Sequence, residues 1–305
     1  MQPLRGIGLK LASVVVFIAM ASLIKATSHH VPPGQAVFFR SFFAIPVIAG
    51  WLFLRHELHQ GVGTSNYAGH FFRGLMGVMA MGMGFAGLGY LPLPEVTALG
   101  YAAPLLTVIF AAMFLSERVG IYRFGMVGLG MVGVLIVVSP RLTVGASATH
   151  AQTLGAMLVL GGAVFSALAQ VFVRKLVQTE RTATIVFWFS FNAAALSLVT
   201  LPFGWVVPSP TEAALLVLAG LLGGVGQILL TASYREADAS VVAPFEYASI
   251  LFALGIGYVV FDEVPTLTML AGAALVVLAG ILIIWRERKL GLERASQRKA
   301  MTPQG

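Results

Sequence analysis

The chain has 305 residues, of which 58% are hydrophobic and only 10% are charged, and its formal net charge is +7. A soluble domain carries roughly 25% charged residues, so a soluble protein of this composition could not cover its surface with polar groups. The sequence contains no cysteine, which excludes a disulfide framework and a thiolate metal site. These features indicate an integral membrane protein.

Apolar runs follow one another along the whole chain, each close to the roughly 20 residues that a membrane-spanning helix needs. There are ten of them, at residues 6–25, 35–54, 71–90, 94–115, 122–139, 153–174, 183–203, 212–234, 239–261 and 266–286. Proline and glycine punctuate the connections, as at residues 32–34 and 208–210. Lipid offers no partner for backbone N–H and C=O groups, and helices satisfy these groups internally. The sequence therefore predicts an all-α membrane protein with ten transmembrane helices.

Basic residues indicate how the helices are oriented. With the N-terminus in the cytoplasm, the inner loops contain Arg55, Arg118 and Arg181 among others, whereas the outer loops contain Lys25 and Arg141 at most. Because positively charged loops stay on the cytoplasmic side, we expect both termini in the cytoplasm. The positive charge then serves orientation and contact with the lipid bilayer, and no nucleic-acid partner is expected.

The two halves of the chain resemble each other. Residues 37–44 (VFFRSFFA) match residues 186–193 (VFWFSFNA) at five of eight positions. Glu117 at the end of the fourth span corresponds to Glu263 at the end of the ninth, and we align Tyr101 with Phe245 near the starts of these spans.

Each half would hold five spans, an odd number, so the second half must enter the membrane inverted. We expect a first five-helix repeat at 1–140, a linker at 141–152, a second repeat at 153–288 and a basic cytoplasmic tail at 289–305. Inverted repeats place a binding site near the middle of the membrane and allow it to open to either side. This symmetry favours a secondary transporter that works by alternating access.

Three segments resemble a known family: FFRSFF in the second span, APLLTVIFAAMFLSERV at 103–119, and APFEYASILFALGIGYVVFDEVP at 243–265. They are similar to EamA-type members of the drug/metabolite transporter superfamily. The resemblance covers nearly the whole chain and implies a bacterial inner-membrane carrier of a small molecule. It extends to riboflavin transporters and S-adenosylmethionine uptake carriers. Riboflavin uptake is our first hypothesis, and S-adenosylmethionine uptake or the efflux of amino acids or nucleosides are the alternatives.

Ionisable residues inside the spans are costly and therefore need a function or a structural partner. Glu246 could bind the cargo or exchange a proton, or it could pair structurally with Arg40 or with donors at a helix end. Arg40 could hold an anionic or carbonyl group of the cargo, or it could extend its charge to the membrane face or form a structural pair. Lys10 and Lys25 lie near span ends, where we expect them to extend to the membrane face. Glu263 fits helix capping better than cargo binding.

Uncharged polar and aromatic residues complete the predicted site. Amides inside the spans could read the polar edge of a planar cargo, and aromatic rings could stack on it. The alternative is that amides join helices and that aromatics belong to interfacial belts. The predicted substrate-binding residues are Glu246, Tyr101, Phe245, Tyr247, Trp188, Asn192, Gln170, Gln227 and Arg40. We expect spans one, three, four, six, eight and nine to line the cavity.

Other classes of function fit the sequence less well. It contains no GxSxG, HExxH or GxxxxGK[ST] motif, and His29, His30 and His150 lack the carboxylate spacing of a metal site. We expect no catalytic residues, no metal and no cofactor. A channel would usually gather rings of residues by oligomerisation, whereas this chain carries its own repeat. Glycine-rich faces on the third and eighth spans could serve internal packing or a homodimer.

Overall fold

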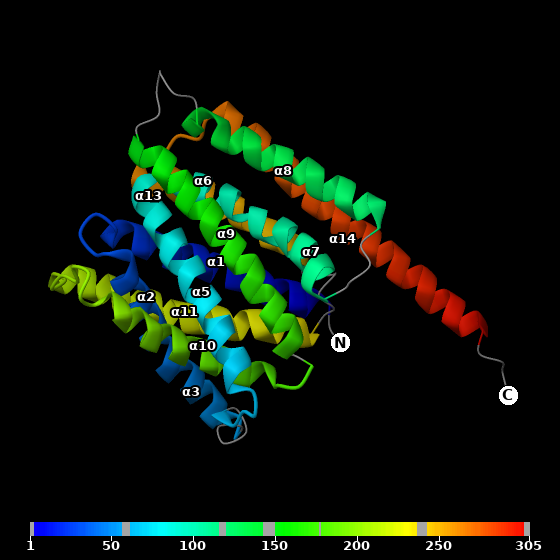
Figure 1. The fold of residues 1–305 in the computed structure, drawn as a ribbon, viewed down its shortest axis with the longest axis horizontal. Coiled ribbons are helices and arrows are strands. Elements are labelled where there is room, and N and C mark those ends of the chain that lie inside the picture. Colours follow the sequence, from blue (N-terminus) through cyan, green and yellow to red (C-terminus); the bar gives the residue numbers. More distant parts are fainter. Residues whose placement is uncertain are drawn as a thin grey trace.

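The computed structural model describes residues 3–56, 62–115, 120–142, 150–176, 178–236 and 243–301, and the regular structure in this part of the chain is helical (Figure 1). The elements are α1 (Pro3–Thr27), α2 (Pro33–Phe42), α3 (Ala44–Leu54), α5 (Tyr67–Tyr90), α6 (Leu93–Gly100), α7 (Ala102–Leu115), α8 (Ile121–Leu142), α9 (His150–Leu176), α10 (Thr182–Ser197), η1 (Leu198–Thr200), α11 (Pro210–Glu236), η2 (Ala243–Ala248), α13 (Ser249–Phe261) and α14 (Leu267–Met301).

Each of the ten predicted spans corresponds to helical structure. Among the described residues, nine stretches are long and apolar enough to cross a membrane, and the shorter apolar stretch Phe245–Phe261 takes the ninth place in chain order. The all-α class and the order of the ten helices are thereby confirmed. The expected start of the ninth span, at 239, lies outside the described residues, as does most of the expected linker.

The second span is divided at Phe43, and the fourth and ninth spans are also discontinuous. Proline explains the break in the fourth span. Pro104 has no N–H to donate to the carbonyl of Gly100 four residues earlier, and α6 ends at Gly100. Tyr101 fills the turn before α7. The ninth span begins as the 3₁₀ segment η2 and becomes α-helical only at Ser249. Transporters commonly build binding sites at such interrupted helices.

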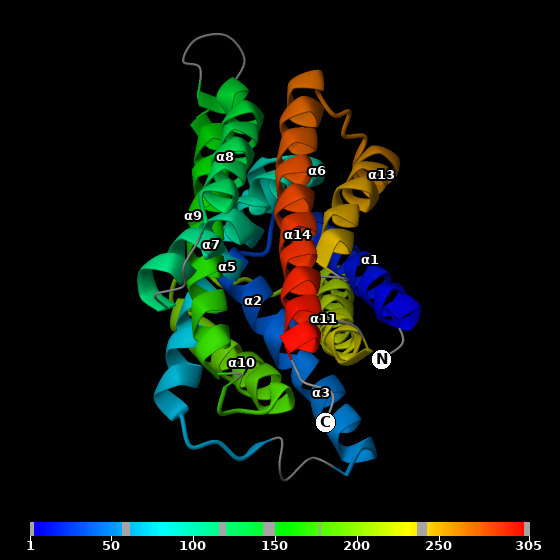
Figure 2. The same ribbon diagram turned by 90° about the vertical axis from the view of Figure 1, so that its right-hand side faces the viewer.

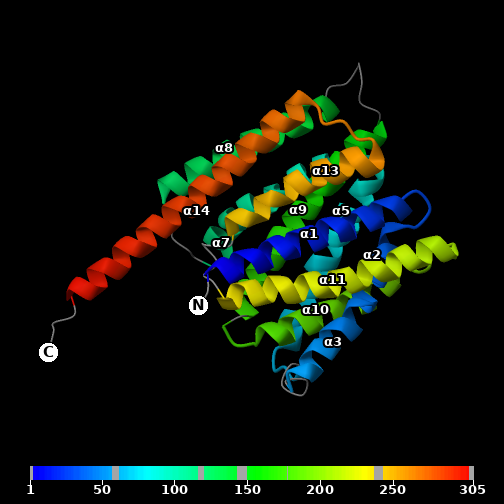
Figure 3. The same ribbon diagram turned by 180° about the vertical axis from the view of Figure 1, so that it is seen from behind.

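Packing between the helices follows the inverted repeat. α1 packs along α11, α5 packs along α9, and α8 packs along α14, and the last pair stands out in all three views (Figures 1, 2 and 3). In the repeat, the first span (α1) corresponds to the sixth (α9), and the third span (α5) corresponds to the eighth (α11). The α1–α11 and α5–α9 pairs are therefore equivalent. The same correspondence maps the α8–α14 pair onto itself. The start of α1 and the end of α14 lie toward the same end of the bundle (Figures 1 and 3).

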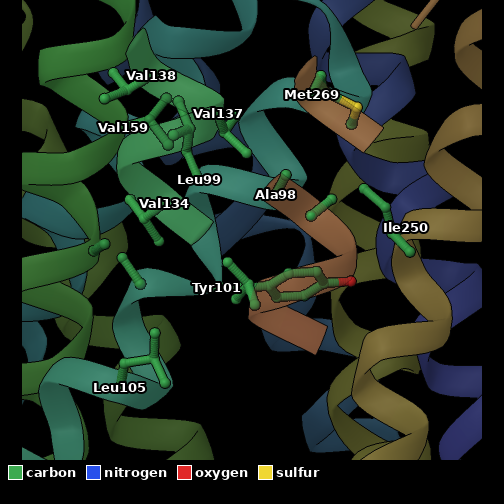
Figure 4. Packing of buried hydrophobic residues seen from close by; sticks show 14 of the residues in the cluster. Ala98, Leu99, Tyr101, Leu105, Val134, Val137, Val138, Val159, Ile250 and Met269 are labelled. Atoms are coloured by element: carbon green, nitrogen blue, oxygen red, sulfur yellow. The ribbon is translucent and has the colours of Figure 1, made fainter. Parts of the chain in front are cut away.

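The outer surface is apolar in a way that water would not tolerate. Ile121, Leu251 and Val259 are 93%, 67% and 78% exposed, and many other large apolar side chains are exposed with them. Exposed apolar area on this scale marks contact with lipid. Inside, one cluster of buried residues joins α6, α7, α8 and α9 to α13 and α14 (Figure 4). A second cluster joins α1, α2, α5 and α11 to α6 and α13.

The α8–α14 contact brings the two backbones close together. A Cβ at Gly133 would lie 2.8 Å from the carbonyl oxygen of Gly272, and one at Gly272 would lie 2.6 Å from the carbonyl oxygen of Gly133. Small residues of this kind let membrane helices approach backbone to backbone. The contact holds the fifth and tenth spans together beside the interrupted fourth and ninth spans.

Candidate functional site

A cavity of about 600 Å³ lies among α6, α7, α8, α9, α11, η2, α13 and α14. This volume falls within the roughly 300–1,000 Å³ typical of small-molecule sites. Spans four, six, eight and nine line it as expected. Spans one and three do not, because α1 and α5 pack along α11 and α9; spans five and ten contribute Arg123, Gly280 and Ile284 instead. Among the described residues, no group of three or more potential metal ligands is assembled.

Two tyrosines stand at the breaks in the interrupted spans and meet at the cavity wall. The ring centroids of Tyr101 and Tyr247 are 5.0 Å apart with an interplanar angle of 69°, and both residues line the cavity. The hydroxyl of Tyr101 lies 2.5 Å from Oγ of Ser249, and Figure 4 shows it directed toward the segment that bears Ile250. The structure thus brings Tyr101 together with Tyr247, two positions after the residue with which we aligned it.

The hydroxyl end of Tyr247 occupies space that only a glycine leaves open. A Cβ at Gly280 of α14 would overlap the Tyr247 hydroxyl. Ser249 donates a hydrogen bond to the carbonyl oxygen of Glu246 at 2.8 Å. The cavity wall from Tyr101 to Glu246 is therefore held by hydrogen bonds and by a close helix contact, which fixes the positions of its polar groups.

Glu246 is the acidic residue of this wall, and its partner is Lys10 of α1. The two side chains form an ion pair in which Lys10 is 1% exposed and Glu246 is 49% exposed. Pairing of Glu246 with Arg40 was therefore wrong, and so was the expectation that Lys10 extends to the membrane face. α1 contacts η2, and this contact buries Lys10 against the carboxylate. The carboxylate itself stays accessible at the cavity.

Ion pairs join helix ends beyond the end of the cavity that lies opposite Arg123 and Glu246. Lys25 Nζ lies 2.9 Å from Oε1 of Glu263 and donates to the carbonyl of Leu91 at 2.7 Å, so its expected extension to the membrane face was wrong. Glu263 Oε2 accepts the backbone N–H of Leu93 at 2.8 Å. Glu263 thus caps the start of α6, where the first N–H groups lack helical partners. Thr97, which lines the cavity, is one turn further along α6.

A second ion pair lies at the same end. Arg141 donates to both carboxylate oxygens of Glu95, at 2.6 and 3.1 Å, and to Oε1 of Gln152 at 2.8 Å. A two-pronged guanidinium–carboxylate contact is among the strongest in proteins, and this one joins α6, α8 and α9. The sequence analysis missed it, although opposite charges at the same ends of spans four and five were the available signal.

Three predicted site residues lie elsewhere and make structural contacts. The Trp188 indole donates to the carbonyl of Val62 at 2.9 Å, and the Asn192 amide donates to the carbonyl of His70 at 3.1 Å. Arg40 is 3% exposed, which contradicts the expectation that it extends to the membrane face, because α10 and α11 cover it.

The cavity therefore brings together four of the predicted residues, Glu246, Tyr101, Tyr247 and Gln170. It does not include Trp188, Asn192, Arg40, Phe245 or Gln227.

Comparison with known proteins gives the family. The model of the EamA-like transporter family matches the chain twice, at residues 4–139 and 153–285. The chain belongs to the EamA-like transporter family. The two matches fall one in each half, as two repeats of five helices require. This EamA-like protein is a multi-pass membrane transporter and not an enzyme.

Its relatives carry different cargo. The chain is 31% identical over 282 residues to the pseudopaline exporter CntI of Pseudomonas aeruginosa, covering 90% of this chain and 94% of that protein. It is 27% identical over 286 residues to the S-adenosylmethionine uptake transporter of Rickettsia felis, covering 94% of each. A protein of known crystal structure, 19% identical, has a TM-score of 0.66 over 95% of this chain and 99% of that chain, which supports the fold.

Proposed function

We propose that this transporter carries a small metabolite with a cationic group and a flat ring, the chemical class of S-adenosylmethionine, through the 600 Å³ cavity. The observation that carries the proposal is a half-exposed carboxylate beside two tyrosine rings. Glu246 would bind the cationic group, because a hydrogen bond between charged partners is roughly twice as strong as a neutral one. Tyr101 and Tyr247 would contact the ring and the cation, since aromatic faces attract both.

The Lys10 ammonium would compete with a cationic cargo for the Glu246 carboxylate. The Lys10 ammonium forms an ion pair with Glu246, so the carboxylate has a positive partner before any cargo binds. On binding, a cationic cargo would share the Glu246 carboxylate with Lys10, and on release Lys10 would again be its main partner. Gln170, on the opposite helix α9, would donate to or accept from the polar edge of the ring.

The riboflavin hypothesis is the second candidate. The tyrosine pair and Gln170 would suit its flat ring system, but riboflavin has no cationic group for Glu246. None of the relatives named above is a riboflavin carrier. We therefore place S-adenosylmethionine-like cations first.

Alternating access is the mechanism we propose for this movement. The cavity reaches Arg123 and Glu246 at one end and stops one helical turn short of the Lys25–Glu263 pair at the other. We also propose a bacterial inner-membrane location with both termini in the cytoplasm, because the relatives are bacterial and the basic residues favour that side. The cavity would then face the cytoplasm in this state.

Counterflow into proteoliposomes tests the function. Labelled S-adenosylmethionine or, in parallel, labelled riboflavin is added outside vesicles that contain unlabelled S-adenosylmethionine, amino acids, nucleosides or riboflavin. We expect saturable exchange with S-adenosylmethionine, and a loss of about 10-fold or more in Glu246→Gln, since a charge-assisted bond contributes about 1.5–3 kcal/mol. Glu236→Gln is the matched control, because Glu236 pairs with Arg5 at 3.5 Å and does not line the cavity.

Three outcomes would contradict the proposal. Exchange of riboflavin alone would replace the proposed cargo with the second candidate. Equal activity of the Glu246→Gln and Glu236→Gln variants would remove Glu246 from the site. Flux that rises linearly with concentration would indicate a channel.

A further inference from the structure

Two arginines, the buried Arg40 and the partly buried Arg73, lie over one aromatic ring, away from the cavity. The guanidinium carbon of Arg73, on α5, is 3.6 Å from the ring centroid of Phe189 on α10, and that of Arg40, on α2, is 5.6 Å from it. Sharing one ring keeps the two positive charges close together. Arg40 Nε also lies only 3.2 Å from where a Cβ of Gly223 on α11 would be. The two guanidinium groups therefore lie among α2, α5, α10 and α11.

The described residues do not neutralise these charges. Nε and Nη1 of Arg40 and of Arg73 are buried and have no hydrogen-bond partner, and no ion pair within the described ranges joins either guanidinium to a carboxylate. The carboxylate of Glu180 is directed elsewhere: its Oε1 accepts from Thr64 at 2.6 Å and lies 3.9 Å from His70 Nε2.

An aromatic ring does not replace an anion for a buried guanidinium. The attraction of a cation to a ring face is smaller than the cost of holding the charge in a membrane interior without a counter-charge. It also leaves the in-plane N–H donors unused, because the ring is approached from the face. The hydroxyls of Ser41 and Ser190, the chain neighbours of Arg40 and Phe189, are buried and also have no partner. Unsatisfied donors gathered from three helices point to a missing acceptor.

We infer that Arg40 and Arg73 form a binding site for an oxyanion, a carboxylate or phosphate group. The planar fork of a guanidinium matches both groups, since each offers two oxygens to two parallel N–H donors. Neither arginine lines the cavity, so this site is separate from the one proposed for the cation, and either can fail without the other. The anion could be free in solution or could be the phosphate of a lipid.

Thermal unfolding of the purified protein in neutral detergent tests the inference. Sodium acetate, sodium phosphate and sodium chloride are compared at equal ionic strength. A ligand that binds only the folded state raises the unfolding midpoint, and we expect acetate or phosphate to raise it by about 2–4 °C over chloride at roughly ten times the dissociation constant. The Arg40→Gln and Arg73→Gln variants should show no such rise.

Arg55→Gln is the matched control. Arg55 is exposed and its guanidinium carbon lies 5.1 Å from the ring centroid of Trp51, so this change removes a similar contact outside the site and should leave the rise intact. If a glutamine variant fails to fold, Arg73→Lys keeps the charge without the fork and should show a smaller rise than the wild type. A full rise in Arg73→Lys would count against the site.

A second arm identifies the source of the anion. Phosphatidylglycerol added to phosphatidylcholine micelles should raise the midpoint when a lipid phosphate is the ligand, and the free anions should raise it when the ligand is soluble. In either case the rise must depend on Arg40 and Arg73. The inference is overturned if neither source raises the midpoint, or if the rise is the same in the glutamine variants.

Discussion

Replacing Glu263 with glutamine should favour opening of the bundle at the end where Glu263 pairs with Lys25. Glu263 holds Lys25 at 2.9 Å and the N–H of Leu93 at 2.8 Å. The two charged side chains are only 12% and 14% exposed, so solvent screens their attraction weakly. Glutamine has the same shape and one carbonyl oxygen, and can therefore keep one of these contacts. It loses the charge and the second acceptor.

The size of the effect follows from the bonds that are lost. A hydrogen bond to a charged group contributes about 1.5–3 kcal/mol. The substitution removes this contribution from the closed state. It leaves the free energy of the open state unchanged, because Lys25 and Glu263 are already separated there. The ratio of closed to open molecules should therefore fall by about 10- to 150-fold.

The lack of cysteine makes the measurement direct. A single Thr97→Cys substitution puts one thiol in the cavity, one turn from Leu93. A membrane-impermeant maleimide is applied to right-side-out and inside-out vesicles, and the ratio of the two labelling rates is compared with and without Glu263→Gln. We expect Glu263→Gln to raise the labelling rate from the Glu263 side by about 10-fold or more relative to the rate from the opposite side.

The matched control uses an ion pair at the surface near the same end. Glu212 lies 3.0 Å from His30 Nδ1, and the His30 side chain is 53% exposed. Exposed pairs contribute little, so Glu212→Gln should leave the labelling ratio unchanged. If Glu263→Gln behaves like Glu212→Gln, the Lys25–Glu263 pair is not a gate, and the reasoning from its burial is wrong.

Two further predictions concern packing. Gly133→Ala puts a Cβ 2.8 Å from the carbonyl oxygen of Gly272 and should destabilise the fold by about 1–3 kcal/mol. Gly128→Ala in the same helix meets nothing within 4 Å and should stabilise the fold by up to about 1 kcal/mol. Equal unfolding midpoints of the two variants by tryptophan fluorescence would contradict the close α8–α14 contact. Trp188→Phe loses the bond to Val62 and should cost about 1 kcal/mol of stability with no change in the KM for cargo; a selective loss of flat cargo would instead place Trp188 in the binding site.

Sequence reasoning was most successful where the physics is local. A span is recognised from the hydropathy of about 20 consecutive residues, because lipid requires each helix to satisfy its own backbone. Each predicted span corresponds to helical structure for this reason. The inverted repeat was recognisable too, because duplicated residues such as Glu117 and Glu263 keep their order along the chain.

Sequence reasoning was weaker for the site. Of the predicted residues, Trp188 and Asn192 lie well inside apolar runs like Gln170, yet only Gln170 lines the cavity. An amide or indole in a span serves packing or binding according to which neighbour its helix face meets. Hydropathy does not encode that rotation, since all faces of a buried membrane helix are apolar.

The amino-acid sequence by itself determined that the protein is surrounded by lipid, that its fold is all-α, how many spans it has and that its second half is inverted. Each of these properties depends on composition or on order along the chain. Only the tertiary structure decided that Glu246 pairs with Lys10, 236 positions away, that Tyr101 meets Tyr247, and that Arg40 and Arg73 share one ring. These contacts depend on the register and rotation of helices packed against one another, which the packing of the whole bundle sets.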